Sequence, residues 1–159
     1  MTATSIPAIE RSAATLLRGT HMDFPANTAL NHRSNLGNAI DRGLMWLADL
    51  DGAVVGFLFA EPEPAGLYLR ELAVAGHAQR RGLGAALMNA GIAAARERGY
   101  ARVMLTTDRT LPWNAPFYAR LGFGIVEGDA IPAEIQRRLH GQYAAGFDPA
   151  ARCAMVLAL

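Results

Sequence analysis

The chain has 159 residues, of which 52% are hydrophobic and 18% charged, and its formal net charge is +1. This composition predicts a globular protein with a sizeable core and excludes a disordered chain. The nearly balanced charge gives no reason to expect nucleic acid or a membrane surface as a partner. The sequence has no run of about 18 apolar residues and no basic stretch followed by an apolar one, so we expect a cytoplasmic protein without a membrane span or signal peptide.

Apolar periodicity and turn residues predict helices and strands along the whole chain. In chain order, the expected elements are a helix over 7–18, a loop over 21–33, a short helix over 35–41, strands over 44–50 and 53–60, a loop over 61–66, a strand over 67–74, a helix over 82–98, a strand over 102–107, a short helix over 114–121, a strand over 123–127, a helix over 132–143 and a closing strand over 152–159. Asp51-Gly52 predicts a tight hairpin between the first two strands. This order favours an α/β fold, a mixed sheet flanked by helices, in a single domain over residues 1–159.

The only cysteine, Cys153, excludes an internal disulfide and fits a reducing compartment. It lies in the apolar run 153–157, which favours a buried structural thiol over a nucleophile. Histidines and acidic residues show no metal-ligand spacing, so we expect no metal.

The most informative segment, residues 79–88, joins the strand over 67–74 to the helix over 82–98. No Ser, Thr, Asp or Asn lies between Val74 and Leu87 to cap the free N–H groups of the first helical turn. Arg80 and Arg81 instead add positive charge to a helix end that the helix dipole already makes positive. Backbone N–H groups at a helix start bind phosphate well, and glycines let it approach. The segment therefore predicts an anion-binding site.

A carboxylate lies inside the strand that precedes this turn. Strand alternation places Glu71 on the same face as Leu67 and Leu69. Burial of a carboxylate raises its pKa, and a carboxylate tuned in this way is a good general base near neutral pH. The alternative is an ion pair between Glu71 and a neighbouring arginine, such as Arg70.

Two motifs resemble one protein family. The pattern Gln79-x-x-Gly82-x-Gly84, placed after a strand, is similar to the acyl-CoA signature of the GCN5-related N-acetyltransferases. The segment 114–123, an Asn followed by Tyr118 and then Gly-Phe, resembles the second signature block of the same family. The resemblance is clearest over residues 44–123.

The resemblance implies the acyl-CoA N-acyltransferase fold, in which two parallel strands, here 67–74 and 102–107, splay apart around acetyl-CoA. It implies transfer of the acetyl group to a primary amine by direct attack in a ternary complex. Glu71 would be the base, and Tyr118 would donate a proton to the departing thiolate, although Tyr118 could instead be a core aromatic. The residues expected to bind the cofactor are Leu72, Ala73, Val74, Gln79, Arg80, Arg81, Gly82, Leu83, Gly84, Ala85 and Asn114.

The sequence departs from the family at its start, because residues 1–5 are too few for the usual first strand, which is therefore short or missing. The exposed sheet edge that would result favours a homodimer. The sequence does not choose between a small-molecule amine and a peptide as the acceptor. Four residues of the loop before the hairpin could line the acceptor site or could be solvated loop residues: His21, Asp23, His32 and Arg33. Trp113 could wall that site or fill the core.

Two other functions remain as alternatives. One is a non-catalytic acyl-CoA-binding or regulatory module of the same fold. The other is an unrelated nucleotide-binding α/β enzyme. The chain lacks both a P-loop sequence and a Gly-x-Gly-x-x-Gly turn after the strand, which argues against this alternative.

Overall fold

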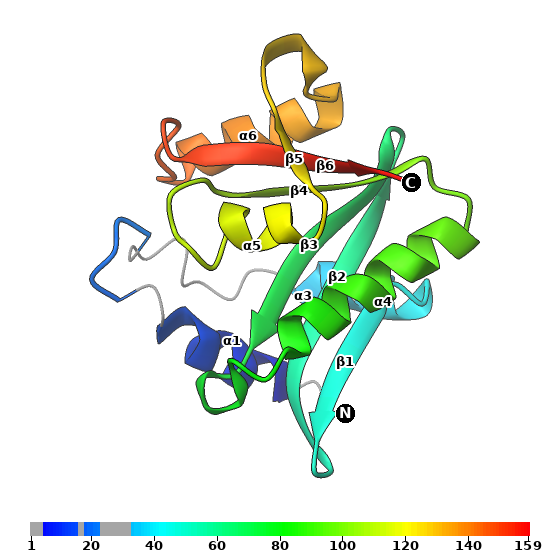
Figure 1. Cartoon of the computed structure of the whole chain (residues 1–159), viewed down its shortest axis with the longest axis vertical. Helices are drawn as coiled ribbons and strands as arrows, with labels where there is room; N and C mark the ends of the chain where they lie inside the picture. The colour runs from blue at the N-terminus through cyan, green and yellow to red at the C-terminus, as the bar shows by residue number, and fades with distance from the viewer. Residues whose placement is uncertain (1–4, 16–17, 23–32) are drawn as a thin grey trace. The chain divides into compact units, whose positions relative to one another are not determined.

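In the computed structural model, which describes residues 5–15, 18–22 and 33–159, six strands form a mixed sheet in the order β1-β2-β3-β4-β6-β5 (Figure 1). The strands are β1 (Met45–Leu50), β2 (Ala53–Glu63), β3 (Gly66–Val74), β4 (Arg102–Asp108), β5 (Gly124–Val126) and β6 (Arg152–Ala158). The α-helices are α1 (Ser5–Ala14), α3 (Arg33–Asp41), α4 (Leu83–Glu97), α5 (Ala115–Arg120) and α6 (Ala133–Ala144), with short 3-10 turns η2 (Gly76–Ala78) and η3 (Gly128–Ala130). The predicted fold class, a mixed sheet flanked by helices, is confirmed.

The chain divides into two compact units. The first contains Met1–Glu61 and Leu69–Ala94, and the second contains Pro62–Tyr68 and Ala95–Leu159. Strands β2 and β3 each contribute residues to both. The single domain expected over residues 1–159 remains a prediction.

The first unit is built on the hairpin of β1 and β2. These strands are antiparallel, with Leu50 opposite Ala53 across the turn. Both turn residues have positive φ, 54° at Asp51 and 85° at Gly52, as a tight primed turn requires. The backbone N–H of Gly52 also donates a 2.9 Å hydrogen bond to the Asp49 carboxylate. The predicted hairpin is confirmed.

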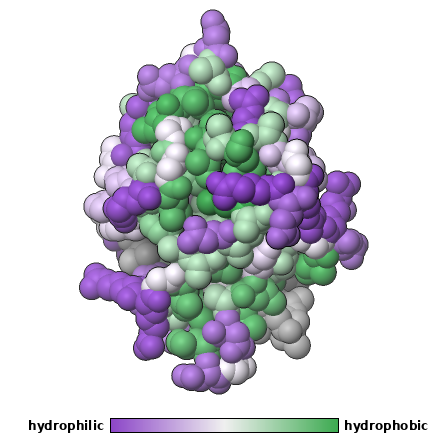
Figure 2. Space-filling model, turned by 45° about the vertical axis from the view of Figure 1, so that its right-hand side comes forward, coloured by the Kyte–Doolittle hydropathy of each residue, from purple (hydrophilic) through white to green (hydrophobic). Residues whose placement is uncertain are grey.

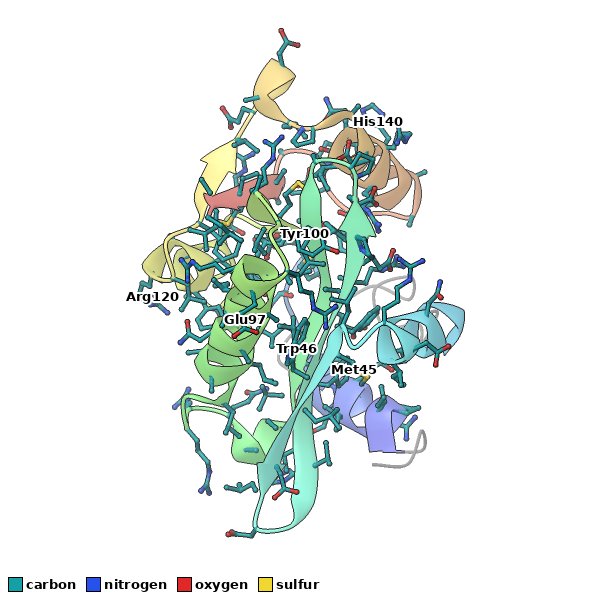
Figure 3. All side chains as sticks on the ribbon, turned by 90° about the vertical axis from the view of Figure 1, so that its right-hand side faces the viewer. Met45, Trp46, Glu97, Tyr100, Arg120 and His140 are labelled. Carbon is teal, nitrogen blue, oxygen red and sulfur yellow. The ribbon has the colours of Figure 1, made fainter. Side chains whose placement is uncertain are left out.

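Helix α4 packs closely on this hairpin because it carries Gly91 where the two approach. A Cβ atom at Gly91 would lie 2.8 Å from Cδ2 of the fully buried Leu58, and 3.8 Å from the Trp46 ring. Trp46 points toward α4, and Met45 points to the other side of β1 (Figure 3). The small residue therefore lets the helix lie flat on the sheet.

The second unit packs α6 against β4 and β6. Strand β6 pairs antiparallel with β4, from Arg102 opposite Ala158 to Asp108 opposite Arg152. The core between helix and strands is formed by Tyr68, Met104, Ile135, Leu139 and Ala154. Strand β4 also pairs in parallel with the start of β3, Leu67 opposite Val103 and Tyr68 opposite Met104. The predicted splay of the two strands beyond this point remains a prediction.

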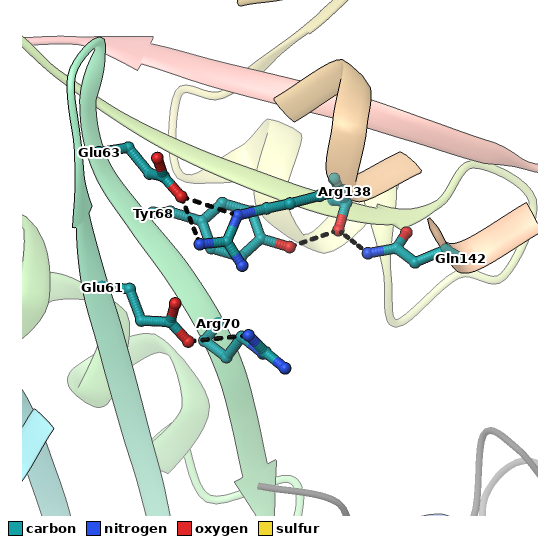
Figure 4. A network of polar contacts seen from close by, with 7 residues as sticks. Glu61, Glu63, Tyr68, Arg70, Arg138 and Gln142 are labelled. Carbon is teal, nitrogen blue, oxygen red and sulfur yellow. Dashed lines mark hydrogen bonds and ion pairs between the residues drawn. The ribbon is translucent and has the colours of Figure 1, made fainter. Parts of the chain in front are cut away.

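The loop predicted over 61–66 is wrong. Strand β2 continues to Glu63, and only Pro64 and Ala65 form the turn before β3. Two acidic residues of this segment pair with arginines: Glu61 with Arg70 at 2.8 Å, and Glu63 with Arg138 (Figure 4). Arg138 lies 75 residues from Glu63 in the sequence, so local composition could not reveal that contact.

Several expectations fall on segments that the structure does not describe. Residues 1–4, on which the short or missing first strand depends, lie outside the described residues, as do 23–32 in the expected acceptor loop. The first helix is present but its α-helical part ends at Ala14, not at Arg18. Within the described ranges, no helix is long and apolar enough to cross a membrane.

Apolar and hydrophilic side chains are interspersed on the face of the molecule drawn in Figure 2. Large hydrophobic side chains that are exposed, among the described residues, are Ile40, Leu47, Trp113 and Ile125. Trp113 is 40% exposed, so it does not fill the core. Cys153 is buried, as predicted, and burial raises the pKa of its thiol.

Candidate active site

Glu71 lies in the second half of β3 with its side chain half-buried. Burial, and to a smaller extent the negative charge of Glu10 and a side-chain hydrogen bond with Glu10, raise the pKa of its carboxyl to about 8, although the charge of Arg70 lowers it. Arg70 forms its 2.8 Å ion pair with Glu61 on β2 (Figure 4). Desolvation therefore outweighs the attraction of Arg70, and the carboxyl keeps its proton through neutral pH.

Glu10 on α1 is the partner that sequence reasoning missed. Ile6 and Ile9 of α1 are buried, but the sequence gave no sign of which strand this helix meets. The structure joins α1 to the segment after β3, because the Gly76 N–H donates a 2.9 Å hydrogen bond to Oγ of Ser12. No local signal in the sequence could have found this contact, since its two ends are 64 residues apart.

The turn between β3 and α4 has an unusual backbone. Arg80 has φ 63° and Gly82 has φ 77°. Left-handed φ at a non-glycine residue is uncommon and is often found at functional sites, whereas glycine adopts it freely. The side chains of Arg80 and Arg81 are exposed. The turn therefore presents two cationic side chains beside a helix start.

Helix α4 begins at Leu83, and its first turn contains no acidic residue. The N–H of Ala86 donates the first helical hydrogen bond, to the carbonyl of Gly82, at 3.0 Å. The N–H groups of the residues before Ala86 have no helical acceptor, as in every helix. Together with the arginines, they form the arrangement that binds phosphate groups well.

Gln79 holds this turn onto the end of β3. Its side-chain Nε2 donates a 2.9 Å hydrogen bond to the carbonyl of Val74, and its backbone N–H donates a longer one, 3.4 Å, to Gly76. The turn is also anchored from inside, where Ala75 and Ala78 pack against Val55. Gln79 therefore has a structural bond that the sequence did not predict, and its contact with a cofactor remains a prediction.

The backbone of β3 has one edge directed away from β2. The N–H of Ala75 donates to the carbonyl of Val55 on β2 at 2.7 Å. Successive N–H groups of an extended chain point to opposite edges. The N–H groups of Leu72 and Val74 consequently point away from β2, toward the edge where an extended ligand could pair with them.

In the second unit, helix α5 carries Tyr118 and begins after Asn114. Asn114 occupies the cap position of this helix, but its side chain makes no capping hydrogen bond. Pro116 lies in the first turn, and Gly122, with φ 102°, follows the helix. The amide of Asn114 is thus not used by the helix.

The ring of Tyr118 lies edge-on to Phe117 and Phe123, with ring centroids 5.1 and 6.2 Å away. Burial raises the pKa of the Tyr118 hydroxyl to about 12, although the charge of Arg152 lowers it. The phenol therefore stays protonated near neutral pH, and its O–H can donate a hydrogen bond.

A chain of polar side chains from β3, β4, α6 and β6 positions Arg152. The hydroxyls of Tyr68 and Thr106 are 2.8 Å apart, and the Gln142 amide donates to Oγ1 of Thr106 at 3.0 Å (Figure 4). The Nε–H of Arg152 then donates to Oε1 of Gln142 at 2.7 Å. The guanidinium also stacks on the ring of Phe147, 4.4 Å from its centroid. The sequence gave no hint of this network, because its members come from four separate elements.

Asp108, at the end of β4, builds the turn that leads to α5. It is fully buried, and its Oδ1 accepts hydrogen bonds from the N–H and hydroxyl of Thr110, both at 2.7 Å, and from the N–H of Leu111 at 3.0 Å. Among the described residues, no group of three or more His, Cys, Asp or Glu side chains could hold a metal ion.

The predicted site residues fall into two sets. Glu71 and the residues expected to bind the cofactor over 72–74 and 79–85 belong to the first unit, while Asn114 and Tyr118 belong to the second. A family model described as the acetyltransferase (GNAT) family matches residues 13–123, more than half of the chain and both sets. The chain belongs to this family. The family and the class of enzyme predicted from the sequence, an acyltransferase, are confirmed.

Solved structures of other acetyltransferases share the fold of this GNAT protein. The PaiA N-acetyltransferase of Thermoplasma acidophilum, in complex with coenzyme A, is 14% identical, with a TM-score of 0.72 over 98% of this chain and 92% of that one. The ribosomal-protein-S18-alanine N-acetyltransferase of Escherichia coli is 21% identical, with a TM-score of 0.66 over 99% of this chain and 90% of that one.

A third structure is longer than this chain. The N-acetylglutamate synthase of Neisseria gonorrhoeae, in complex with coenzyme A and N-acetyl-glutamate, is 20% identical, with a TM-score of 0.70. The match covers 99% of this chain but only 34% of that one, so the GNAT chain spans about a third of the synthase. The coenzyme A bound in two of these three relatives agrees with the predicted co-substrate, acetyl-CoA.

Proposed function

We propose that this protein transfers the acetyl group of acetyl-CoA to a primary amine, by direct attack of the amine in a ternary complex. One observation carries the proposal. Strand β3 bears a half-buried carboxyl, Glu71, whose pKa is about 8, and runs directly into a turn with two exposed arginines at the start of α4. A base and an anion-binding helix start are thus built into one continuous segment.

The co-substrate would be held by this segment. The backbone N–H groups of residues 81–85 and the side chains of Arg80 and Arg81 would bind the pyrophosphate of coenzyme A. The outward N–H groups of Leu72 and Val74 would pair with the pantetheine arm, and the N–H near Val74 would polarise the acyl carbonyl. Asn114 would contact the cofactor through the side-chain amide that the helix does not use.

Glu71 would take the proton of the amine. An alkyl ammonium has a pKa of about 10.4, and it must lose a proton before the nitrogen can attack. A carboxylate of ordinary pKa is a poor match for this proton, whereas burial brings the Glu71 pKa to about 8. The proton transfer, directly or through water, is then much less unfavourable.

Tyr118 would assist the departure of the thiolate. Its hydroxyl is held protonated by burial, with a pKa of about 12, and can donate to the sulfur. An ordinary thiol has a pKa of about 8.5, well below the pKa of Tyr118, so complete transfer of the phenol proton to the thiolate is unfavourable. Tyr118 would therefore stabilise the departing thiolate mainly by a hydrogen bond. The nearby charge of Arg152, which lowers the pKa of Tyr118, would strengthen that donation.

The acceptor is a small-molecule amine or a peptide. The relatives support this range, since one was solved with N-acetyl-glutamate and another is named for the alanine of a ribosomal protein. Their low identities carry the fold alone, so they do not choose between an amino acid and a protein N-terminus for this chain.

Two measurements test the proposal. Calorimetric titration with acetyl-CoA, ATP and NAD should show preferential binding of acetyl-CoA; preference for ATP or NAD would overturn it. A panel of amino acids, polyamines and N-terminal peptides, followed by release of free thiol, should then identify an acceptor. If acetyl-CoA binds but no amine in the panel causes release of free CoA thiol, the result would instead support a non-catalytic acyl-CoA-binding module. The Glu71→Gln protein serves as the control for uncatalysed transfer.

A further inference from the structure

Helix α1 brings a second carboxyl to the base. Its Ile6 and Ile9 are buried, and Ser12 accepts a hydrogen bond from the N–H of Gly76, just beyond the end of β3. Glu10 lies between these anchors, with its side chain half-buried. The helix is therefore fixed against the first unit on both sides of Glu10.

Glu10 and Glu71 are joined by a hydrogen bond between their side chains. Two carboxylates have only acceptor oxygens, so this bond requires that one of the two carries a proton. Arg70 on β3 is the other charged group that acts on Glu71, and it forms an ion pair with Glu61 on β2, while Arg11 on α1 is exposed. Arg70 is thus already engaged with a carboxylate of its own.

We propose that Glu10 is a positioning residue of the base, and that the proton removed from the amine ends shared between the carboxyls of Glu10 and Glu71. This inference rests on the proposed function and adds a second carboxyl, Glu10, to its general base, Glu71. In the step, the N–H bond of the ammonium breaks, its electron pair stays on nitrogen for attack, and a new O–H bond forms on Glu71. The hydrogen bond from this O–H to Glu10 then stabilises the proton.

The physical reason for a second carboxyl is the strength of the base. Two ionised carboxylates in a poorly solvated site repel one another, and this repulsion is relieved when one proton is bound. The doubly ionised pair is therefore a stronger base than Glu71 alone, and it also attracts a cationic amine. The pair titrates as a unit, with the upper step belonging to the loss of the shared proton.

The first test needs no activity. The side-chain carboxyl carbons of glutamate are followed by ¹³C NMR against pH in the free protein, in Glu10→Gln, and in a matched control, Glu97→Gln. Glu97 is an exposed glutamate at the end of α4 (Figure 3). The upper step, near pH 8 in the unaltered protein, should fall by about one unit or more in Glu10→Gln and stay in place in the control. An upper step that does not move in Glu10→Gln overturns the proposal.

A second variant assigns the step without depending on the first. In Glu71→Gln, the resonance that titrates near pH 8 should disappear. If it persists, the step belongs to another glutamate and the shared proton is wrong. Thermal unfolding of each variant at pH 5 confirms that it is folded before titration.

The activity arm separates the inference from the proposed function. With an amine identified by thiol release, the rising limb of kcat/KM against pH should move to lower pH in Glu10→Gln, with a lower plateau because the remaining base is weaker. A limb that stays in place, together with a shifted NMR step, would overturn the role of Glu10 in catalysis. If no amine causes release of free CoA thiol, the proposed function is overturned. The NMR titration would still decide whether the two carboxyls share a proton.

Discussion

The side chain of Gln79 donates a 2.9 Å hydrogen bond to the carbonyl oxygen of Val74, the last residue of β3. This bond closes the segment that links the strand to the arginine-glycine turn, and it fixes where the turn begins. The side chain thus supports, from within, the turn that we propose to bind the pyrophosphate.

Replacement of Gln79 by alanine should therefore weaken acetyl-CoA binding. One neutral hydrogen bond contributes about 1 kcal/mol, so the Kd measured by calorimetry should rise about fivefold while kcat changes little. Asn89→Ala, an amide removed from the exposed side of α4, is the matched control and should leave Kd unchanged. An unaltered Kd in Gln79→Ala would show that the turn keeps its shape without this bond.

Arg81→Ala should lower the affinity for acetyl-CoA about tenfold, since hydrogen bonds to charged groups contribute more than neutral ones. The loss should shrink at high ionic strength, which screens an exposed charge. Acetyl-pantetheine, which lacks the pyrophosphate, should bind equally to both proteins. Arg96→Ala, at the opposite end of α4, is the control. A tenfold loss that extends to acetyl-pantetheine would place Arg81 elsewhere than at the pyrophosphate.

Glu71→Gln should reduce turnover about a hundredfold or more, because general base catalysis by the carboxylate is lost. The rising limb of the pH–rate profile near pH 8 should vanish, while calorimetry still shows acetyl-CoA binding. A variant with the same pH dependence as the unaltered protein would remove Glu71 from the mechanism.

The same substitution should change how stability depends on pH. Because the folded protein raises the Glu71 pKa from its ordinary value to about 8, the folded state binds the proton more tightly than the unfolded state. The resulting stabilisation is complete below the ordinary pKa and is lost as pH rises toward 8. Glutamine stays neutral, so the Tm of Glu71→Gln relative to the unaltered protein should rise by a few degrees between pH 5 and pH 8.5.

Partial exposure of Glu71 screens part of this effect, so the sign is the decisive feature. Differential scanning fluorimetry in matched buffers measures it, with Glu97→Gln as the control whose Tm difference should be the same at both pH values. A Tm difference that falls with pH would mean that the Glu71 pKa is not raised.

Tyr118→Phe should lower kcat about tenfold or more and leave the Kd of acetyl-CoA within about twofold, since only the donor to the thiolate is removed. The pKa of about 12 also predicts that the unaltered protein shows no loss of activity from Tyr118 between pH 8 and pH 10. Tyr100→Phe, outside the site, is the control. Full activity in Tyr118→Phe would return this side chain to a packing role.

The elements of this fold were largely predictable from local patterns. The Asp51-Gly52 hairpin, the alanine-rich helix α4 and the closing strand β6 each have a signal within a few residues, so their order and the mixed sheet followed. The loop predicted over 61–66 was an error. Glu61 and Glu63 lie in β2, where Glu61 pairs with Arg70 on the neighbouring strand β3 and Glu63 pairs with Arg138, 75 residues away in the sequence.

The candidate site likewise has a part that local sequence predicts and a part that only packing determines. The sequence by itself predicted the anion-binding turn and the role of Glu71, because both belong to one continuous segment whose chemistry is indicated by neighbouring residues. Only the tertiary structure decided that Gln79 binds back to Val74, that Glu10 of α1 meets Glu71, and that Arg152 lies near Tyr118. Each of these depends on a contact made when elements pack, and the pKa of a side chain follows from the groups that packing places around it.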